Sequence, residues 1–446
     1  MIKVNLIAKT DLDPLTLISH AAKTCYTSTV PEIGATMDIE NNLFKTGHHT
    51  TFQHNYFTFN ISGLSVSAAT FGLHLTHSFY NTDQRSGRFS KMYSKPDFDE
   101  IKNYILSYWP KCDIEKVMDF IELGREIYAN NIEKATVLVE QHIKKERPFA
   151  NDEYIKMNAG KIAQEQMRMF ISTISPTALD YSINLSTLSA IYRSAWSPEM
   201  REITSQMKNL VLAEYPYLEY VFDDKYRRVD NWIPEMKFDK IGIKKLPVLN
   251  VLNIDLDKNA KFNIDTKDSV DLKYFTPENM DNNISTIKTS VELSIATMGQ
   301  DQRHRAIKRG IPSFTGNFYL PPILDELGLE EKALDFVKQY FNLTKILDKS
   351  LLLAIAPYGL MINYTKLSDI NGLIHEQEKR LCWSAQEEIY HLSKQLHDYL
   401  MNNSYEKLAE RLTPACYKGA CIEGRRYCGR DIQKVKIDKS IPIRKI

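Results

Sequence analysis

Apolar and polar residues alternate in several short stretches of the chain and recur with a helical period in longer ones. Alternation over residues 1–7 and 56–61 predicts strands, since successive side chains of a strand point to opposite faces. The region from about 97 to 174 has a mainly helical period. We expect Asp11 or Asp13 to cap a first helix after the first strand, because a short acidic side chain accepts unpaired N–H groups there.

A similar succession of elements runs through the second half of the chain. Residues 248–252 and 262–265, joined by a polar segment, predict a hairpin. Apolar runs over 65–80 in the first half and 291–298 in the second predict helices that lead into arginine-bearing loops. A long amphipathic helix is expected over about 370–402.

The junction between the two halves is predicted near residues 228–240, where prolines and lysines follow no clear period. We expect a first unit over 1–232 and a second over 233–446, with a cysteine-containing tail from about 412. Both units repeat the order strand, helix, arginine-bearing loop and helices, which a duplication explains most simply. The predicted fold class is α+β, with two tandem units that each pack a small, mostly antiparallel sheet against long helices.

The composition is that of an ordinary soluble globular protein, with 446 residues, 43% apolar and 25% charged. A net charge of +1 gives no reason to expect bulk attraction to nucleic acid or to membranes. No apolar run approaches the length of a membrane span, and the N-terminal residues favour a strand over a signal peptide. We therefore expect a cytoplasmic protein without nucleic-acid or membrane partners.

Six cysteines in a chain of this length do not form a disulfide framework. Cys25, Cys112 and Cys382 occur singly in apolar or helical segments, where buried free thiols are expected. Three further cysteines lie near the C-terminus: Cys416, Cys421 and Cys428. They could bind zinc or act in redox chemistry, but a fourth ligand is missing and the spacing is not that of a standard finger. An unliganded tail is the expectation.

Two basic stretches more than two hundred residues apart are the main candidates for ligand binding. The second half carries Gln300 and then Arg303, His304 and Arg305, which place cationic donors for a planar or phosphorylated ligand at one helix end. The first half carries a run of five polar or small residues: Gln84, Arg85, Ser86, Gly87 and Arg88. We expect the two stretches to be halves of one site. The alternative for each is a solvated loop or basic surface.

Two single arginines in predicted helices are further candidates. Arg168 lies among apolar residues, where a charge needs a carboxylate or a bound anion as partner. Arg380 lies in the last long helix, and its alternative role is a surface ion pair with Glu376 or Glu387 at helical spacing.

Histidines precede the second predicted strand, at His48, His49 and His54. No cysteine or carboxylate completes a ligand set at a recognisable spacing, so no metal site is expected here.

These stretches resemble the flavin-dependent thymidylate synthases, whose signature begins Arg-His-Arg and ends Ser-x-Arg-aromatic, after a His-rich segment and a Phe-Thr-Phe strand. In the first half, residues 48–54 and 57–59 match the lead-in, and 86–89 match the end of the signature. In the second half, Gln300 and 303–305 match its beginning.

Each half lacks the part of the signature that the other half keeps. Thr76, His77 and Ser78 stand where the first half would carry Arg-His-Arg, and 313–315 read Ser-Phe-Thr where the second half would carry Ser-x-Arg. In the family, each site lies between subunits of a homotetramer. One subunit gives the beginning of the signature and another gives its end. The resemblance therefore implies sites built from one first unit and one second unit, in a homodimer acting as a pseudo-tetramer.

The resemblance also implies roles for individual residues. It gives Arg380 the catalytic position beside the pyrimidine and gives dUMP binding to Gln300, to residues 84–88 and to Arg168. It gives FAD binding to a further set: Arg303, His304, Arg305, Asn371, His375, His48 and Thr50.

The implied activity is conversion of dUMP to dTMP, with methylenetetrahydrofolate as carbon donor and NADPH-reduced FAD as hydride source. Two alternatives stay open. One is a related enzyme that modifies C5 of deoxyuridylate differently, for example by hydroxymethylation. The other is a non-catalytic protein that binds a flavin or a nucleotide.

Overall fold

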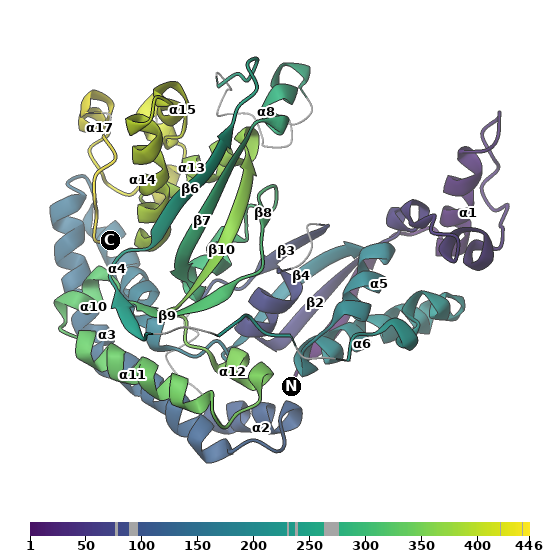
Figure 1. Ribbon diagram of the computed structural model, residues 1–446, viewed down its shortest axis with the longest axis horizontal. Coiled ribbons are helices and arrows are strands. Elements are labelled where there is room, and N and C mark those ends of the chain that lie inside the picture. The colour runs from purple at the N-terminus through teal and green to yellow at the C-terminus, as the bar shows by residue number, and fades with distance from the viewer. Residues whose placement is uncertain are drawn as a thin grey trace.

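Figure 1 shows the computed structural model, an α+β protein built on two sheets. The structure describes residues 1–75, 79–88, 97–229, 232–236, 240–262, 276–419, 421–438 and 440–446. The positions Thr76, His77 and Ser78 therefore lie outside the described residues. No helix in the described part of the chain is both long and apolar enough to cross a membrane.

The first sheet is antiparallel, with strand order β1-β2-β4-β3. Its strands are β1 (Lys3–Lys9), β2 (Tyr56–Ser65), β3 (Tyr80–Gln84) and β4 (Pro176–Asn184). The two predicted first-half strands are thereby confirmed. Alternate side chains of β2, such as Phe57, Phe59 and Ile61, are buried, as the period of two predicts.

The second sheet is mixed, with strand order β5-β9-β10-β7-β6, and a short β8 also pairs with β10. Its strands are β5 (Gly242–Lys244), β6 (Val248–Asp255), β7 (Thr286–Ser294), β8 (Lys308–Arg309), β9 (Ser313–Tyr319) and β10 (Leu360–Asp369). Only the pairing of β5 with β9 is parallel among these described strands. The order β6-β7-β10-β9 repeats that of β1-β2-β4-β3.

Helices follow the strands in the same sequence in both halves. The helices of the first half are α1 (Pro14–Thr24), α2 (Phe98–Tyr108), α3 (Ile114–Glu146), α4 (Asp152–Met167), α5 (Leu185–Ser194) and α6 (Pro198–Glu214). Those that follow are α8 (Met280–Ile284), α9 (Ile295–Asp301), α10 (Pro322–Glu326), α11 (Glu330–Leu343), α12 (Lys349–Ile355), α13 (Ile370–Arg380), α14 (Glu387–Asn402), α15 (Glu406–Arg411), α16 (Ala415–Lys418) and α17 (Ile432–Asp438). Helices α5 and α6 contact the first sheet, and α13 and α14 contact the second (Figure 1).

The first helix begins as its sequence predicts. Asp13 is the N-cap of α1, and its carboxylate accepts a hydrogen bond of 3.2 Å from the backbone N–H of Thr16. Pro14 occupies the first turn, where its missing N–H has no helical partner to lose.

Several predicted element boundaries are wrong. β6 pairs with β7 and not with residues near 262, and residues 263–265 lie outside the described part of the chain. The run 291–298 is the end of β7 followed by α9, because a fully buried strand and a buried helix have the same apolar composition. For the same reason the helix predicted over 65–80 is wrong at its start: β2 extends to Ser65, and a short π-helix over Ala68–Leu73 follows.

The long helix predicted over 370–402 is two helices. α13 ends at Arg380 and α14 begins at Glu387, and the loop between them turns several backbone carbonyls towards arginines. Arg444 donates to the carbonyls of Trp383 and Ala385, at 2.9 Å for Trp383. These contacts from distant residues replace the helical hydrogen bonds that continuation of α13 would have made.

One apolar core extends through both halves. The 33-residue helix α3 crosses beneath the sheets in Figure 1 and contacts α4 and α11. Phe120 of α3 stacks on Phe336 of α11 with ring centroids 4.7 Å apart, and Phe170 packs against Phe318 of β9 at 5.5 Å. The burial of these rings stabilises the contact between the halves.

The single cysteines are less buried than expected. Cys25 is exposed, and Cys112 and Cys382 are half-buried. Cys25 directly follows the last residue of α1, where the side chain has left the buried face of the helix.

Gly124 allows α3 to approach the chain near Phe170 closely. A Cβ atom at this position would lie 2.2 Å from the carbonyl oxygen of Phe170, which is backbone and cannot move aside cheaply. We expect Gly124→Ala to lower the free energy of unfolding by about 1–3 kcal/mol through overpacking. Gly160 in α4 is the matched control, because an added Cβ meets nothing within 4 Å there.

In chemical denaturation, Gly160→Ala should raise the free energy of unfolding by up to about 1 kcal/mol, since alanine favours the helix. Equal effects of the two substitutions would contradict a close approach at Gly124.

Candidate functional site

A cavity of about 210 Å³ lies between the two halves of the chain. Its lining comes from the end of β3 and the loop after it, from the start of the η4 turn (Arg168–Phe170), and from α9, α13 and their neighbours. The lining residues are Val66, Thr70, Gln84, Arg85, Ser86, Gly87, Arg88, Arg168, Ile295, Ala296, Gly299, Gln300, Arg303, Tyr358 and Arg380. The structure thus brings the two predicted basic stretches, Arg168 and Arg380 together within one chain.

Besides Arg85, two first-half arginines that line this cavity, Arg88 and Arg168, contact the second half. Arg88 forms an ion pair with the buried Glu165 and donates to the carbonyl of Ser384 at 2.8 Å. Arg168 donates to Oε1 of Gln386 at 2.9 Å, and its guanidinium lies 5.1 Å from the ring centroid of Tyr358. Both arginines therefore contact residues of the second half.

The second half contributes two more guanidinium groups. Arg380, the last residue of α13, donates to the carbonyl of Gln300 at 2.6 Å, and Gln300 in turn donates to Gln386. Arg303 donates to Oε1 of Gln84 at 3.2 Å, which is a contact with the first half. The alternative role of Arg380 was an ion pair with Glu376. Glu376 instead forms an ion pair with Lys366.

The electrostatics of the cavity favour an anion. Burial lowers the pKa of Arg380 to about 10; the carboxylates of Glu376 and Asp301 oppose this, and the nearby Arg88 and Arg303 lower the pKa further. Mutual repulsion of guanidiniums of this kind is relieved when a bound anion is shared among them. The buried Nε atoms of Arg168 and Arg380 have no hydrogen-bond partner.

Residues 5–217 match the model of the family described as "Thymidylate synthase complementing protein". Over these residues the chain belongs to this family. No curated protein matches the sequence.

Solved structures similar to this chain include two kinds of nucleotide enzyme. One is thymidylate synthase X from Helicobacter pylori with FAD and dUMP, at 20% identity over 51% of this chain and 100% of that chain, with a TM-score of 0.33. Another is a UMP/dUMP methylase from Streptomyces cacaoi bound with 5-Br dUMP, at 14% identity over 50% of this chain and 94% of that chain, with a TM-score of 0.34.

His304 and its neighbours form a group beside the cavity. The rings of His304 and His375 lie 5.4 Å apart in an edge-to-face arrangement, and the guanidinium of Arg305 lies 5.4 Å from the ring of Tyr80. Both ring nitrogens of His304 are buried without a hydrogen-bond partner. Burial, with help from Arg380 and His375, holds the pKa of His304 well below its usual range, so the imidazole is neutral.

The remaining predicted residues do not line the cavity. Asn371 is fully buried at the start of α13 and donates to Asn283 at 2.6 Å and to the carbonyl of Asn279 at 3.2 Å. His48 and Thr50 are exposed at the short helix over His49–His54, beside α5. The structure places this segment next to a separate cavity of about 240 Å³ that includes His49 and Arg193.

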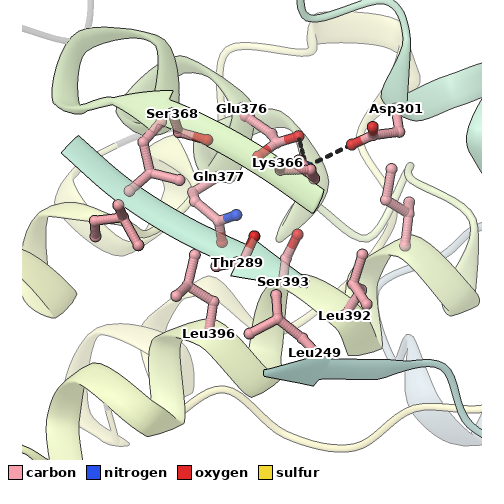
Figure 2. Close-up of a pocket in the computed structure, with 13 residues that line it drawn as sticks. Leu249, Thr289, Asp301, Lys366, Ser368, Glu376, Gln377, Leu392, Ser393 and Leu396 are labelled. Carbon is pink, nitrogen blue, oxygen red and sulfur yellow. Dashed lines mark hydrogen bonds and ion pairs between the residues drawn. The ribbon is translucent and has the colours of Figure 1, made fainter. Parts of the chain in front are cut away.

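A buried charge network lies behind the second-half side of the cavity, and Figure 2 shows part of it, with Lys366 between Asp301 and Glu376 at a separate, smaller pocket. Lys366 of β10 donates to Asp301 at 2.5 Å and to Glu376 at 2.7 Å, and Asp301 also pairs with Arg309 and accepts from Tyr364 at 2.8 Å. Burial alone would raise the pKa of Asp301, but Arg309 and Lys366 outweigh it and hold that pKa well below its usual range. The network fixes the end of α9 to β10 and α13, and so fixes Gln300 beside Arg380.

The sequence analysis missed several residues of this arrangement. Gln386 joins Arg168 to Gln300, and Tyr358 covers Arg168, but neither residue type marks a site by itself. Lys366 offered a usable signal, because it falls on the same face of its strand as Ile362 and Tyr364, and a lysine on a buried face requires a buried carboxylate.

Removal of the Lys366 ammonium leaves Glu376 buried without its cation. We expect Lys366→Met to lower the free energy of unfolding by roughly 3–5 kcal/mol, the usual cost of an uncompensated buried charge. The double variant K366M/E376Q should recover part of this loss, because the stranded charge is gone. Lys338→Met is the control, since its ion pair with Asp335 is half-exposed and is worth about 1 kcal/mol or less. A double variant no more stable than K366M would contradict this account.

Proposed function

We propose that this chain is a flavin-dependent thymidylate synthase, which converts dUMP to dTMP with methylenetetrahydrofolate as carbon donor and NADPH-reduced FAD as hydride source. The observation that carries the proposal is the meeting of Arg88 and Arg168 with Arg303 and Arg380 at one cavity. Membership of the thymidylate synthase complementing family over residues 5–217 supports it.

The first-half arginines bind the nucleotide phosphate in this proposal. A nucleotide monophosphate is a dianion, and Arg88 and Arg168 offer charge-assisted hydrogen bonds from two directions. Glu165 orients Arg88, and Gln386 orients Arg168, so that neither guanidinium has to be ordered when the ligand arrives.

Arg380 acts on the pyrimidine. Its guanidinium stabilises negative charge as N3 of uracil loses its proton, which makes C5 nucleophilic without an enzyme thiol. Arg380 is held by the carbonyl of Gln300, and its charge persists at neutral pH because its pKa is about 10. The positioned cation therefore needs no rearrangement during the reaction.

The group around His304 is the proposed flavin site. Arg303 and Arg305 provide positive charge for the pyrophosphate, and the neutral His304 offers two unpaired ring nitrogens to a planar polar ligand. When bound, FAD supplies the hydride that completes the methyl group. His48 and Thr50 are exposed away from the cavity, so we propose that a second copy of the chain brings them to the flavin in a homodimer.

The proposal includes descent from two fused units. The repeated strand order in the two sheets and the helix pairs α5–α6 and α13–α14 after corresponding strands support a duplication. Each unit then supplies the part of the site that the other lacks.

Replacement of Arg380 tests the proposed chemistry. We expect Arg380→Ala to lower the turnover of dUMP to dTMP by about 100-fold or more, with the melting temperature and flavin absorbance little changed. Lys134→Ala, an exposed cation on α3, is the control and should keep full turnover. Product analysis by chromatography separates dTMP from a hydroxymethylated product.

Arg303→Ala should yield protein that has lost the yellow flavin colour. A wild-type protein that turns over no dUMP with folate, FAD and NADPH present would overturn the proposed function, as would an Arg380→Ala variant with wild-type turnover.

A further inference from the structure

The loop between α13 and α14 supplies hydrogen-bond acceptors to three side chains that line the cavity. The carbonyl of Ser384 accepts from Arg88 at 2.8 Å, and Oε1 of Gln386 accepts from Arg168 at 2.9 Å. Gln300 donates to the same Oε1 atom. The position of this loop therefore sets the orientation of the donors around the cavity.

Arg444 holds the same loop through two of its backbone carbonyls. The side chain is buried, and it donates to the carbonyl of Trp383 at 2.9 Å and to the carbonyl of Ala385. The carbonyl of Ser384, which accepts from Arg88, lies between these two in the chain. A planar guanidinium presents its donors in a fixed geometry, so it fixes the two carbonyls relative to each other.

Arg444 is itself anchored to two helices. Its guanidinium lies 4.5 Å from the ring centroid of Tyr390 in α14, and the hydroxyl of Tyr390 donates to the carbonyl of Pro442 at 2.6 Å. The carbonyl of Lys445 accepts from Gln166 of α4 at 2.8 Å. The residues on both sides of Arg444 are therefore held, and its guanidinium has a defined position from which to hold the loop.

We propose that Arg444 is a positioning residue for nucleotide binding at the cavity. It keeps the loop between α13 and α14 where the acceptors of this loop orient Arg88 and Arg168. The inference rests on the proposed function, because the ligand of these two arginines is taken to be the phosphate of dUMP. Arg444 is not among the described residues that line the cavity, so it acts through the loop.

One other arginine shares part of this task. Arg147 donates to the carbonyl of Trp383 at 3.4 Å, which is longer than the bond from Arg444. Removal of the Arg444 guanidinium leaves the loop with this weaker contact and takes away a donor from the carbonyl of Ala385. A buried carbonyl that loses its donor favours a rearranged loop, in which the carbonyl finds another partner.

The test is the affinity of the full chain for dUMP, measured by calorimetry at a temperature well below the melting temperature of each variant. We expect Arg444→Met to raise the Kd for dUMP by about 10-fold or more, the usual effect of losing a well-oriented hydrogen bond to a charged group. Arg444→Lys keeps the buried charge without the planar fork and should cause a smaller rise. A purely structural role would lower the melting temperature and leave the Kd unchanged.

Two variants serve as controls for this measurement. Lys445→Met changes the neighbouring residue, whose side chain forms an ion pair with Glu326 and not with the loop. Arg227→Met removes a half-buried arginine of the first half that donates to the carbonyl of Arg201 at 3.0 Å. Both variants should bind dUMP as the wild type does, even where they lower the melting temperature.

Hydrogen exchange of the wild-type chain gives a second measurement that needs no variant. Coupling between two sites is reciprocal, so dUMP should slow the exchange of backbone amides over residues 383–386 and also over 443–446. Unchanged exchange over 443–446 in the presence of dUMP would overturn the inference, as would a folded Arg444 variant with the wild-type Kd. A wild-type chain that binds no dUMP would overturn the proposed function as well, so the two failures are distinguishable.

Discussion

The carboxylate of Asp301 is the interaction on which the second-half side of the cavity depends. It lies fully buried between Arg309, Lys366 and Tyr364, and through Lys366 it is joined to Glu376 of α13 (Figure 2). A buried carboxylate with several partners tolerates few alternative positions, because any displacement leaves a charge unpaired. Gln300, one residue earlier, is thereby held where its carbonyl accepts from Arg380.

The first half meets this rigid arrangement through polar contacts of its own. Arg88 and Arg168 each reach the loop between α13 and α14, and Gln84 accepts from Arg303. The apolar core below, with Phe120 against Phe336, keeps the two sheets at a fixed separation. Side chains more than two hundred residues apart in sequence therefore form one cationic cavity.

Many residues of the cationic cavity could be predicted from the sequence, because they are of unusual types for their surroundings. Arg168 among apolar residues and Arg303 beside His304 each required an anion or a partner, and the structure brings the two arginines to one cavity. The boundaries of the helices and strands were harder to predict. The apolar run over 291–298 fits a strand or a helix equally well, and the break after Arg380 depends on Arg88 and Arg444, which contact the loop from elsewhere in the chain. The positions of His48 and Thr50 depend on how α1 and α5 pack, which no local pattern encodes.

Both walls of the cavity belong to one polypeptide, and this has a consequence for its response to dilution. A pocket formed between separate subunits is lost when the subunits dissociate, so the fraction of complete pockets varies with protein concentration. Here the contact between Arg303 and Gln84 is intramolecular, so its effective concentration is set by the covalent chain. Whatever the abundance of the protein in the cell, the two walls are always present in equal numbers.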